Sequence, residues 1–216
     1  MNQATILLDL DGTIADSRPG IIASLRAALG DLHHTPAPDE DFTWAVGPPL
    51  PEVWRRLMTQ YGDGRVEFGM ARYRAHYGLT GLYDATLFPG MGDAIEKLYL
   101  AGYDLVVATA KRVEFARRLV ENLGLASRFL GIYGSVPDGS LDDKAALIAD
   151  IMRRENLVAD RMVMVGDRSH DIHAAHANRV RAIGAAWGYG APGELAAAGA
   201  DTIIAAPGEL LAMYIQ

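Results

Sequence analysis

Short unbroken apolar segments alternate with longer segments of helical spacing along most of the chain. The apolar segments lie at residues 4–10, 103–109, 129–133, 161–165, 180–186 and 201–205. Runs of this kind are typical of strands buried on both faces of a parallel sheet. Apolar residues at i, i+3 and i+4 predict helices at 92–100, 113–123, 144–154, 171–178 and 194–198. The alternation predicts an α/β fold with a mainly parallel sheet flanked by helices.

One segment departs from this alternation. Between residues 17 and 83 the chain has three apolar stripes with helical spacing and no strand pattern. Ser17 is the expected N-cap of the first of these helices. We therefore predict a core domain formed by residues 1–15 and 86–216. A small α-helical cap domain, residues 16–85, is inserted after the first strand.

Composition excludes several classes of protein. The 216 residues include 20 Lys and Arg against 27 Asp and Glu, a net charge of −7, which argues against a nucleic-acid partner. The absence of cysteine excludes disulfides, thiolate zinc sites and cysteine nucleophiles. No apolar run reaches the roughly 18 residues of a membrane helix, and the first residues lack the basic segment of a signal peptide. We expect a cytoplasmic protein with no membrane partner.

Carboxylates follow two of the predicted strands. Asp9 and Asp11 end the first strand, and Asp167 and Asp171 follow the strand at 161–165. Ligands of open α/β sheets bind where the strands end, so these groups are expected at one edge. Crowded carboxylates need a cation, and oxygen ligands beside a phosphate favour Mg²⁺. Of two neighbouring carboxylates, one can attack phosphorus while the other transfers a proton.

Each feature alone has a simpler explanation. An Asp-x-Asp pair is common in turns, Thr109 at the end of the second strand could cap a helix, and Lys144 could be a solvated surface residue. A glycine pattern, G-x-G-x-x-G at 188–193, follows a strand, but the 23 residues after it leave no room for a dinucleotide-binding half. The ordered occurrence of the acidic, hydroxyl and lysine groups at strand ends favours a phosphate site.

These residues resemble the motifs of the haloacid dehalogenase (HAD) superfamily over nearly the whole chain. Residues 9–13, Asp-Leu-Asp-Gly-Thr, match D-x-D-G-T, and residues 166–171 match G-D-x-x-x-D. Thr109 and Lys144 match the two motifs between them. The resemblance is to the phosphatase branch with a helical C1 cap, in particular its phosphoglycolate phosphatase-like and 5′-nucleotidase-like members. It implies a Rossmann-like core with an inserted cap.

The resemblance also implies roles for the acidic residues. Asp9 would be the nucleophile that forms an aspartyl-phosphate, and Asp11 the general acid and base. The carboxylates of Asp9 and Asp167 and the backbone carbonyl of Asp11 would hold Mg²⁺. Asp171 would support the waters of the metal or Lys144.

The phosphate-binding residues follow from the same resemblance. Thr109, the backbone amide of Ala110, and Lys144 would hold the phosphoryl oxygens. Ala110 is a departure from the family pattern, because many relatives have Asn or Ser there. The cap loop at Gly47, Pro48 and Pro49 would face the site and contribute to substrate specificity.

The implied function is a Mg²⁺-dependent phosphomonoester hydrolase acting on a small phosphorylated metabolite such as phosphoglycolate or a nucleoside monophosphate. A phosphomutase of the β-phosphoglucomutase type and a non-catalytic phosphate-binding module remain as alternatives. Arg18, Arg55 and Arg56 are candidates for contact with a second anionic group, or are solvated helix residues. We expect a monomer or a homodimer.

Overall fold

A six-stranded parallel sheet forms the centre of the computed structural model, which describes residues 4–214. Its strands are β1 (Thr5–Leu8), β4 (Asp104–Arg112), β5 (Gly131–Ser135), β6 (Met162–Gly166), β7 (Arg181–Ala185) and β8 (Thr202–Ile204). Their spatial order is β5-β4-β1-β6-β7-β8. The four side chains of the central strand β1 are all buried, as its unbroken apolar run predicts. The predicted α/β class is confirmed.

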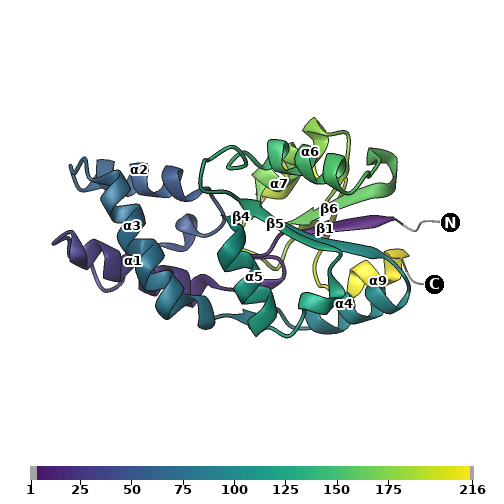
Figure 1. Cartoon of the computed structure of the whole chain (residues 1–216), viewed down its shortest axis with the longest axis horizontal. Helices are drawn as coiled ribbons and strands as arrows, with labels where there is room; N and C mark the ends of the chain where they lie inside the picture. The colour runs from purple at the N-terminus through teal and green to yellow at the C-terminus, as the bar shows by residue number, and fades with distance from the viewer. Residues whose placement is uncertain (1–3, 215–216) are drawn as a thin grey trace.

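Helices cover both faces of this sheet (Figure 1). They are α4 (Met91–Leu100), α5 (Val113–Asn122), α6 (Lys144–Arg154), α7 (Ser169–Ala177), α8 (Glu194–Ala197) and α9 (Gly208–Tyr214). Leu7 of β1 packs with α6 and α7, whereas Ile6 and Leu8 pack with α4, α5 and α9. Successive side chains of a strand point to opposite faces, which produces these two apolar layers. The last helix, α9, was not predicted.

Three further helices lie together at one end of the sheet (Figure 1). They are α1 (Arg18–Asp31), α2 (Leu50–Gln60) and α3 (Val66–Leu79), and we call them the cap helices. Trp54 and Tyr77 are among the largest fully buried side chains between them. A Cβ at Gly69 of α3 would lie 2.3 Å from the Trp54 ring, so α3 approaches α2 closely at this glycine. Single 3₁₀ turns occur at Thr43–Ala45, Gly81–Tyr83, Ala126–Arg128 and Ala159–Arg161.

Two short strands flank the cap helices. β2 (Ala15–Asp16) pairs antiparallel with β3 (Thr86–Leu87), where the chain leaves the core and returns to it. Strands of two residues have no recognisable periodicity, and the sequence did not predict them. The division after residues 15 and 85 stays a prediction.

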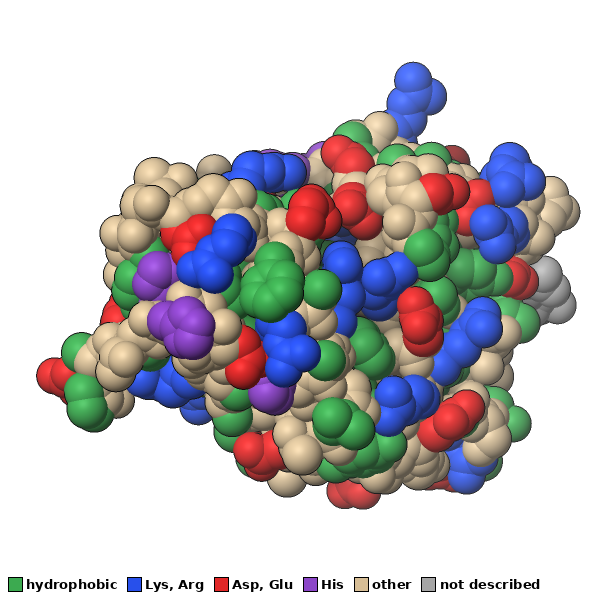
Figure 2. All heavy atoms as spheres, turned by 60° about the vertical axis from the view of Figure 1, so that its left-hand side comes forward, with side chains coloured by type: hydrophobic (Ala, Val, Ile, Leu, Met, Phe, Trp, Pro, Cys, Tyr) green, Lys and Arg blue, Asp and Glu red, His purple; other side chains and the backbone are tan. Residues whose placement is uncertain are grey.

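The exterior is mixed in charge. On the face shown in Figure 2, acidic and basic side chains are interspersed and do not form one continuous basic patch. Among the helices of residues 4–214, none combines the length and the apolar character needed to span a membrane.

Candidate active site

The register of the sheet brings distant residues to one edge. Leu8 of β1 lies opposite Val107 of β4 and Val165 of β6. The backbone N–H of Asp9 donates to the carbonyl of Val165 at 3.0 Å. Asp9 and Asp167 therefore follow strands that end at the same level, on the carboxyl side where α/β folds bind ligands.

Three carboxylates converge at this edge. Oxygen atoms of Asp9, Asp167 and Asp171 all lie within 4.8 Å of one another, and the three residues are buried. Burial raises the pKa of Asp9 from 3.8 to about 6, with the charge of Asp171 adding to the rise and Lys144 opposing it. Burial and the charges of Asp171 and Asp9 also raise the pKa of Asp167 well above its ordinary value. The cluster is short of positive charge.

Glycines allow the backbone to close around these carboxylates. Gly12 has a φ of +91°, and a Cβ there would lie 2.3 Å from Oδ2 of Asp167. A Cβ at Gly188 would lie 2.2 Å from Cβ of Asp167, and the next residue, Tyr189, donates its N–H to Oδ2 of Asp167 at 2.8 Å. The glycine pattern at 188–193 does not form a dinucleotide site. Its glycines allow the loop after β7 to pack directly on Asp167.

Lys144 is the cation of the cluster. It is the first residue of α6, where the helix dipole disfavours positive charge. Its Nζ lies 2.9 Å from Oδ1 of Asp9 and also donates to Asp171. Although burial acts to lower the pKa of Lys144, the carboxylates of Asp171 and Asp9 raise it overall. A lysine buried among these groups is therefore not the solvated surface residue of the simpler explanation.

The cluster fits a hard divalent cation. It offers only carboxylate oxygens, and three buried carboxylates face a single lysine. Oδ1 of Asp9 is buried, and its charge is opposed by the ammonium group of Lys144 at 2.9 Å, a group that Asp171 shares. Oxygen-rich sites of this kind suit Mg²⁺. The side chain of Asp11 is not part of the cluster, and the expected contribution of its backbone carbonyl stays a prediction.

Asp11 is held separately from the metal-type cluster. Ser17 Oγ donates to its Oδ1 at 2.5 Å, and Lys111 Nζ lies 2.8 Å from its Oδ2. Lys111 also donates to the hydroxyl of Tyr77 on α3, at 2.7 Å. Ser17 is the N-cap residue of α1, as predicted, but its side chain makes no capping hydrogen bond because its hydroxyl donates to Asp11. Neither Ser17 nor Lys111 was predicted as a site residue.

Two of the expected phosphate-binding residues, Thr109 and Ala110, lie on β4 directly before Lys111. Thr109 is buried near the end of β4, and its Oγ1 accepts a hydrogen bond from the N–H of Lys111 at 3.2 Å. Ala110 lines the cavity described below. Their contacts with a phosphoryl group stay predictions.

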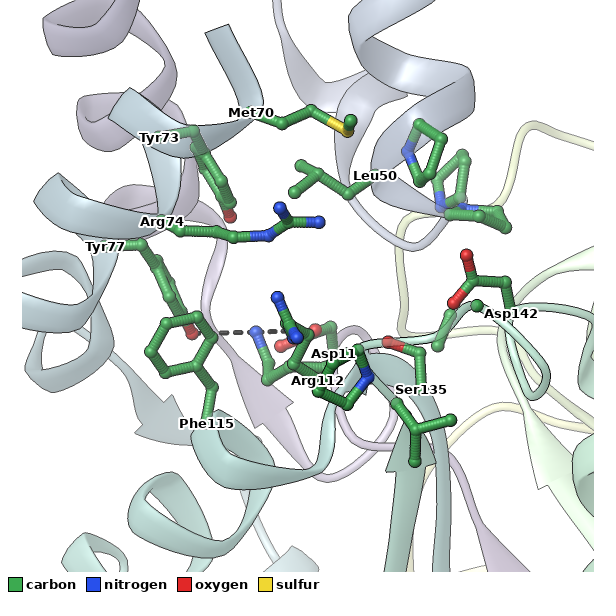
Figure 3. A pocket seen from close by; sticks show the side chains of 18 of the residues that line it. Asp11, Leu50, Met70, Tyr73, Arg74, Tyr77, Arg112, Phe115, Ser135 and Asp142 are labelled. Carbon is green, nitrogen blue, oxygen red and sulfur yellow. Dashed lines mark hydrogen bonds and ion pairs between the residues drawn. The ribbon is translucent and has the colours of Figure 1, made fainter. Parts of the chain in front are cut away.

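A cavity of about 290 Å³ separates the cap helices from the sheet edge (Figure 3). Asp11 and Lys111 lie on its core side, and Gly47, Pro48 and Pro49 line it from the cap loop. The predicted cap loop thus faces the same cavity as Asp11. Its contact with a substrate and its part in specificity stay predictions.

The three arginines considered from the sequence do not line this cavity. Arg18 lies 3.7 Å from Asp16 in an exposed ion pair, Arg56 stacks on Trp44, and Arg55 is exposed. The arginines that line it are Arg74 of α3 and Arg112 of β4. The sequence offers no signal for Arg74, because its place depends on how α3 packs on the core.

The raised pKa of Asp9 predicts a pH-dependent cost to folding. In the unfolded chain Asp9 ionises near 3.8, whereas in the folded protein it ionises near 6, so stability falls as the pH rises between these values. Above pH 6 the cost is about 3 kcal/mol, at about 1.4 kcal/mol per pKa unit. We expect metal-free Asp9→Asn to be more stable than wild type at pH 8, and the two to converge near pH 4.

Urea unfolding of both proteins at the two pH values measures this difference. The histidine–aspartate pairs of the cap are present in both proteins and cancel, so the difference reports the charge of Asp9 together with its effect on Asp167 and Lys144. Parallel pH profiles for the two proteins would show that Asp9 carries no such cost.

Comparisons with known proteins agree with this geometry. Residues 6–185 match the family described as haloacid dehalogenase-like hydrolase. A 5′-nucleotidase of Pseudomonas aeruginosa is 37% identical over 194 residues, which cover 89% of this chain and 86% of that protein. The crystal structure of a predicted phosphatase from Clostridium acetobutylicum has a TM-score of 0.89 and 31% identity, covering 99% of this chain and 98% of that one.

One relative has a different name. The tyrosine-protein kinase PtkA of Mycobacterium tuberculosis is 38% identical over 187 residues, which are 86% of this chain. The matched region spans only 62% of the length of that protein. The similarity therefore concerns a part of PtkA.

Proposed function

The chain belongs to the haloacid dehalogenase-like hydrolases, and we propose that it is a Mg²⁺-dependent phosphomonoesterase that acts through an aspartyl-phosphate on Asp9. Phosphatase activity agrees with the named relatives. The observation that carries the proposal is the convergence of Asp9, Asp167 and Asp171 with Lys144 beside the cavity that holds Asp11.

The first step transfers the phosphoryl group to the protein. A carboxylate oxygen of Asp9 attacks phosphorus, an O–P bond forms, and the bond from phosphorus to the leaving oxygen breaks. Asp11 donates a proton to that oxygen, so the product leaves as an alcohol. Ser17 and Lys111 hold the two oxygens of Asp11, which fixes the direction in which its carboxyl group faces.

The second step releases phosphate. Asp11 takes a proton from water as the water attacks phosphorus, the bond to Asp9 breaks, and the carboxylate of Asp9 is regenerated. Lys144 neutralises charge on the phosphoryl oxygens, and Thr109 and the amide of Ala110 donate hydrogen bonds to them. The cap helices restrict the access of bulk water in the first step, where water would compete with Asp9 for the phosphoryl group.

Asp9 and Asp167 would hold the metal, with Asp171 supporting its shell. When bound, Mg²⁺ neutralises the carboxylates and polarises the phosphoryl group. The three carboxylates are suited to that charge because Lys144 alone does not balance them.

The substrate is a small phosphorylated metabolite. Phosphoglycolate and nucleoside monophosphates are the first to test, the latter because the Pseudomonas aeruginosa relative is named a 5′-nucleotidase. A cytoplasmic location, a monomeric or dimeric state and the lack of a nucleic-acid partner stay predictions from the sequence.

A panel of phosphate esters assayed with and without Mg²⁺ tests the proposal. Metal-dependent release of inorganic phosphate from several esters is the expected result. Conversion of one sugar phosphate into an isomer without net phosphate release would instead indicate a phosphomutase. Binding without turnover would indicate a phosphate-binding module, and either result would refute the proposal.

Lys111 provides a test of the role of Asp11. In Lys111→Met the Asp11 carboxylate loses its ion pair and keeps only the bond from Ser17. We expect kcat to fall about 10- to 100-fold, a part of the 10²- to 10⁴-fold that proton transfer contributes, with a smaller change in KM. Lys97→Met in α4, where the lysine is exposed, is the matched control. Equal kinetics for Lys111→Met and the control would remove Lys111 from the mechanism.

A further inference from the structure

Two arginines of the cavity have no role in the proposed reaction. Arg74 enters it from α3 and Arg112 from the end of β4, and both side chains point into the same space (Figure 3). The Nε atom of each is buried and has no hydrogen-bond partner. A buried N–H without a partner is costly, and the guanidinium ends of both side chains face the cavity, where they can donate hydrogen bonds to a ligand (Figure 3).

Neighbouring carboxylates do not satisfy these arginines. Within residues 4–214, Arg74 forms no ion pair. Arg112 forms an ion pair with Glu114, whose carboxylate lies 3.3 Å from its Nε without hydrogen-bond geometry, but this pair is weakened by solvent because the Glu114 side chain is 58% exposed. Lys111, the third cation of the cavity, is already paired with Asp11.

Three other carboxylates line the cavity. Glu67 and Asp138 are exposed at its rim, and the carboxylate of Asp138 accepts hydrogen bonds from Ser140. Asp142 is partly buried on the opposite side of the cavity from Arg74 (Figure 3). Among the residues that the structure describes, none of these three forms an ion pair with Arg74 or Arg112.

The charge of Arg112 acts on Arg74. Burial lowers the pKa of Arg74, and the charge of Arg112 lowers it further, while Glu67 and Asp142 partly offset this. Like charges that face a common space are stabilised by an anion between them. Guanidinium groups bind carboxylates and phosphates through paired N–H donors.

We propose that Arg74 and Arg112 form a second anion subsite, and that the preferred substrate is a phosphate monoester whose leaving group carries a further carboxylate or phosphate. The inference rests on the proposed function, because it places the reacting phosphate at Asp9. The cavity is continuous from Asp11 to both arginines. Leu50, Met70 and Phe115 also line the cavity and can contact the carbon skeleton.

Matched ester pairs test the subsite. Phosphoglycolate and ethyl phosphate differ by a carboxylate, and adenosine 3′,5′-bisphosphate and adenosine 5′-monophosphate differ by a second phosphate. We expect kcat/KM for the two-anion member of at least one pair to be about 10- to 100-fold higher, as hydrogen bonds between charged groups predict. The pair that shows the preference identifies the anion as carboxylate or phosphate.

Variants connect this preference to the two arginines. Arg74→Met and Arg112→Met should each reduce the preference about tenfold or more, and Arg74→Lys should retain part of it. Arg117→Met in α5, where the arginine is exposed, should leave the preference at its wild-type value. Binding of the same four esters to Asp9→Asn, with and without Arg74→Met, is measured by calorimetry as a readout that does not need turnover.

The outcomes separate the two proposals. The subsite is supported if the wild-type protein prefers the two-anion ester and both Arg74→Met and Arg112→Met lose this preference. Metal-dependent hydrolysis with equal kcat/KM in both pairs, or a preference that survives both variants, overturns the subsite and leaves the phosphatase in place. If no ester is hydrolysed, the proposed function is wrong. Calorimetry then tests the subsite independently of turnover. Equal affinities within both ester pairs would overturn the subsite, whereas tighter binding of the two-anion ester that is lost in Arg74→Met would support it.

Discussion

Replacing Asp9 with asparagine should abolish phosphate release. Asparagine has nearly the same shape but no nucleophilic carboxylate, so the O–P bond of the first step cannot form. Loss of a covalent nucleophile costs about 10⁴- to 10⁶-fold in kcat in well-studied enzymes, and we expect a loss in this range. Steady-state phosphate release with saturating Mg²⁺ measures it.

Two controls make this result specific. Asp160→Asn removes an exposed carboxylate next to the opposite end of β6 and should retain wild-type kcat. Asp9→Asn should remain folded, since the substitution removes a buried charge that raises the cost of folding. A folded Asp9→Asn protein within about tenfold of wild-type kcat would exclude Asp9 as the nucleophile.

Removal of divalent metal should have the second largest effect. Without a cation, the carboxylates of Asp9, Asp167 and Asp171 repel an anionic substrate, and only Lys144 opposes them. Electrostatic stabilisation by a metal is worth several kcal/mol, so chelation should lower kcat/KM by about 10³-fold. Addition of Mg²⁺ should restore the activity.

A variant tests whether these carboxylates hold the metal. Asp167→Asn replaces a charged ligand with a neutral one and should raise the Mg²⁺ concentration that gives half-maximal activity. Asp160→Asn should leave that concentration unchanged. Full activity after chelation, or an unchanged Mg²⁺ requirement in Asp167→Asn, would contradict the metal site.

The residues at the strand ends were predictable because two local patterns agree. An apolar run such as residues 5–8 indicates where a buried strand ends, and parallel strands end at a common edge. Asp9, Asp167 and Lys144 are therefore close together in space although far apart in sequence. The sequence did not show how Gly188 closes on Asp167, because a glycine pattern alone does not reveal which group approaches it.

The cap side of the site was less predictable. Helical spacing identified three helices there, but the docking of α3 decides that Arg74 enters the cavity and that Tyr77 reaches Lys111. Ser17 was predictable as the N-cap of α1 from its residue type and position. The sequence did not predict that its hydroxyl donates to Asp11. The short strands β2 and β3 and the helix α9 depend on tertiary pairing and have no clear sequence pattern.

Direct detection of the covalent intermediate tests the central claim. In Asp11→Asn the hydrolysis of the aspartyl-phosphate lacks its general base, so the intermediate should accumulate from p-nitrophenyl phosphate, whose leaving group departs without a proton from Asp11. Acid quenching during turnover with Mg²⁺, followed by mass spectrometry of peptides, should show the peptide that contains Asp9 heavier by one phosphoryl group. A variant that turns over substrate before the quench but carries no phosphoryl group afterwards would contradict the proposed intermediate. So would a phosphoryl group on a residue other than Asp9.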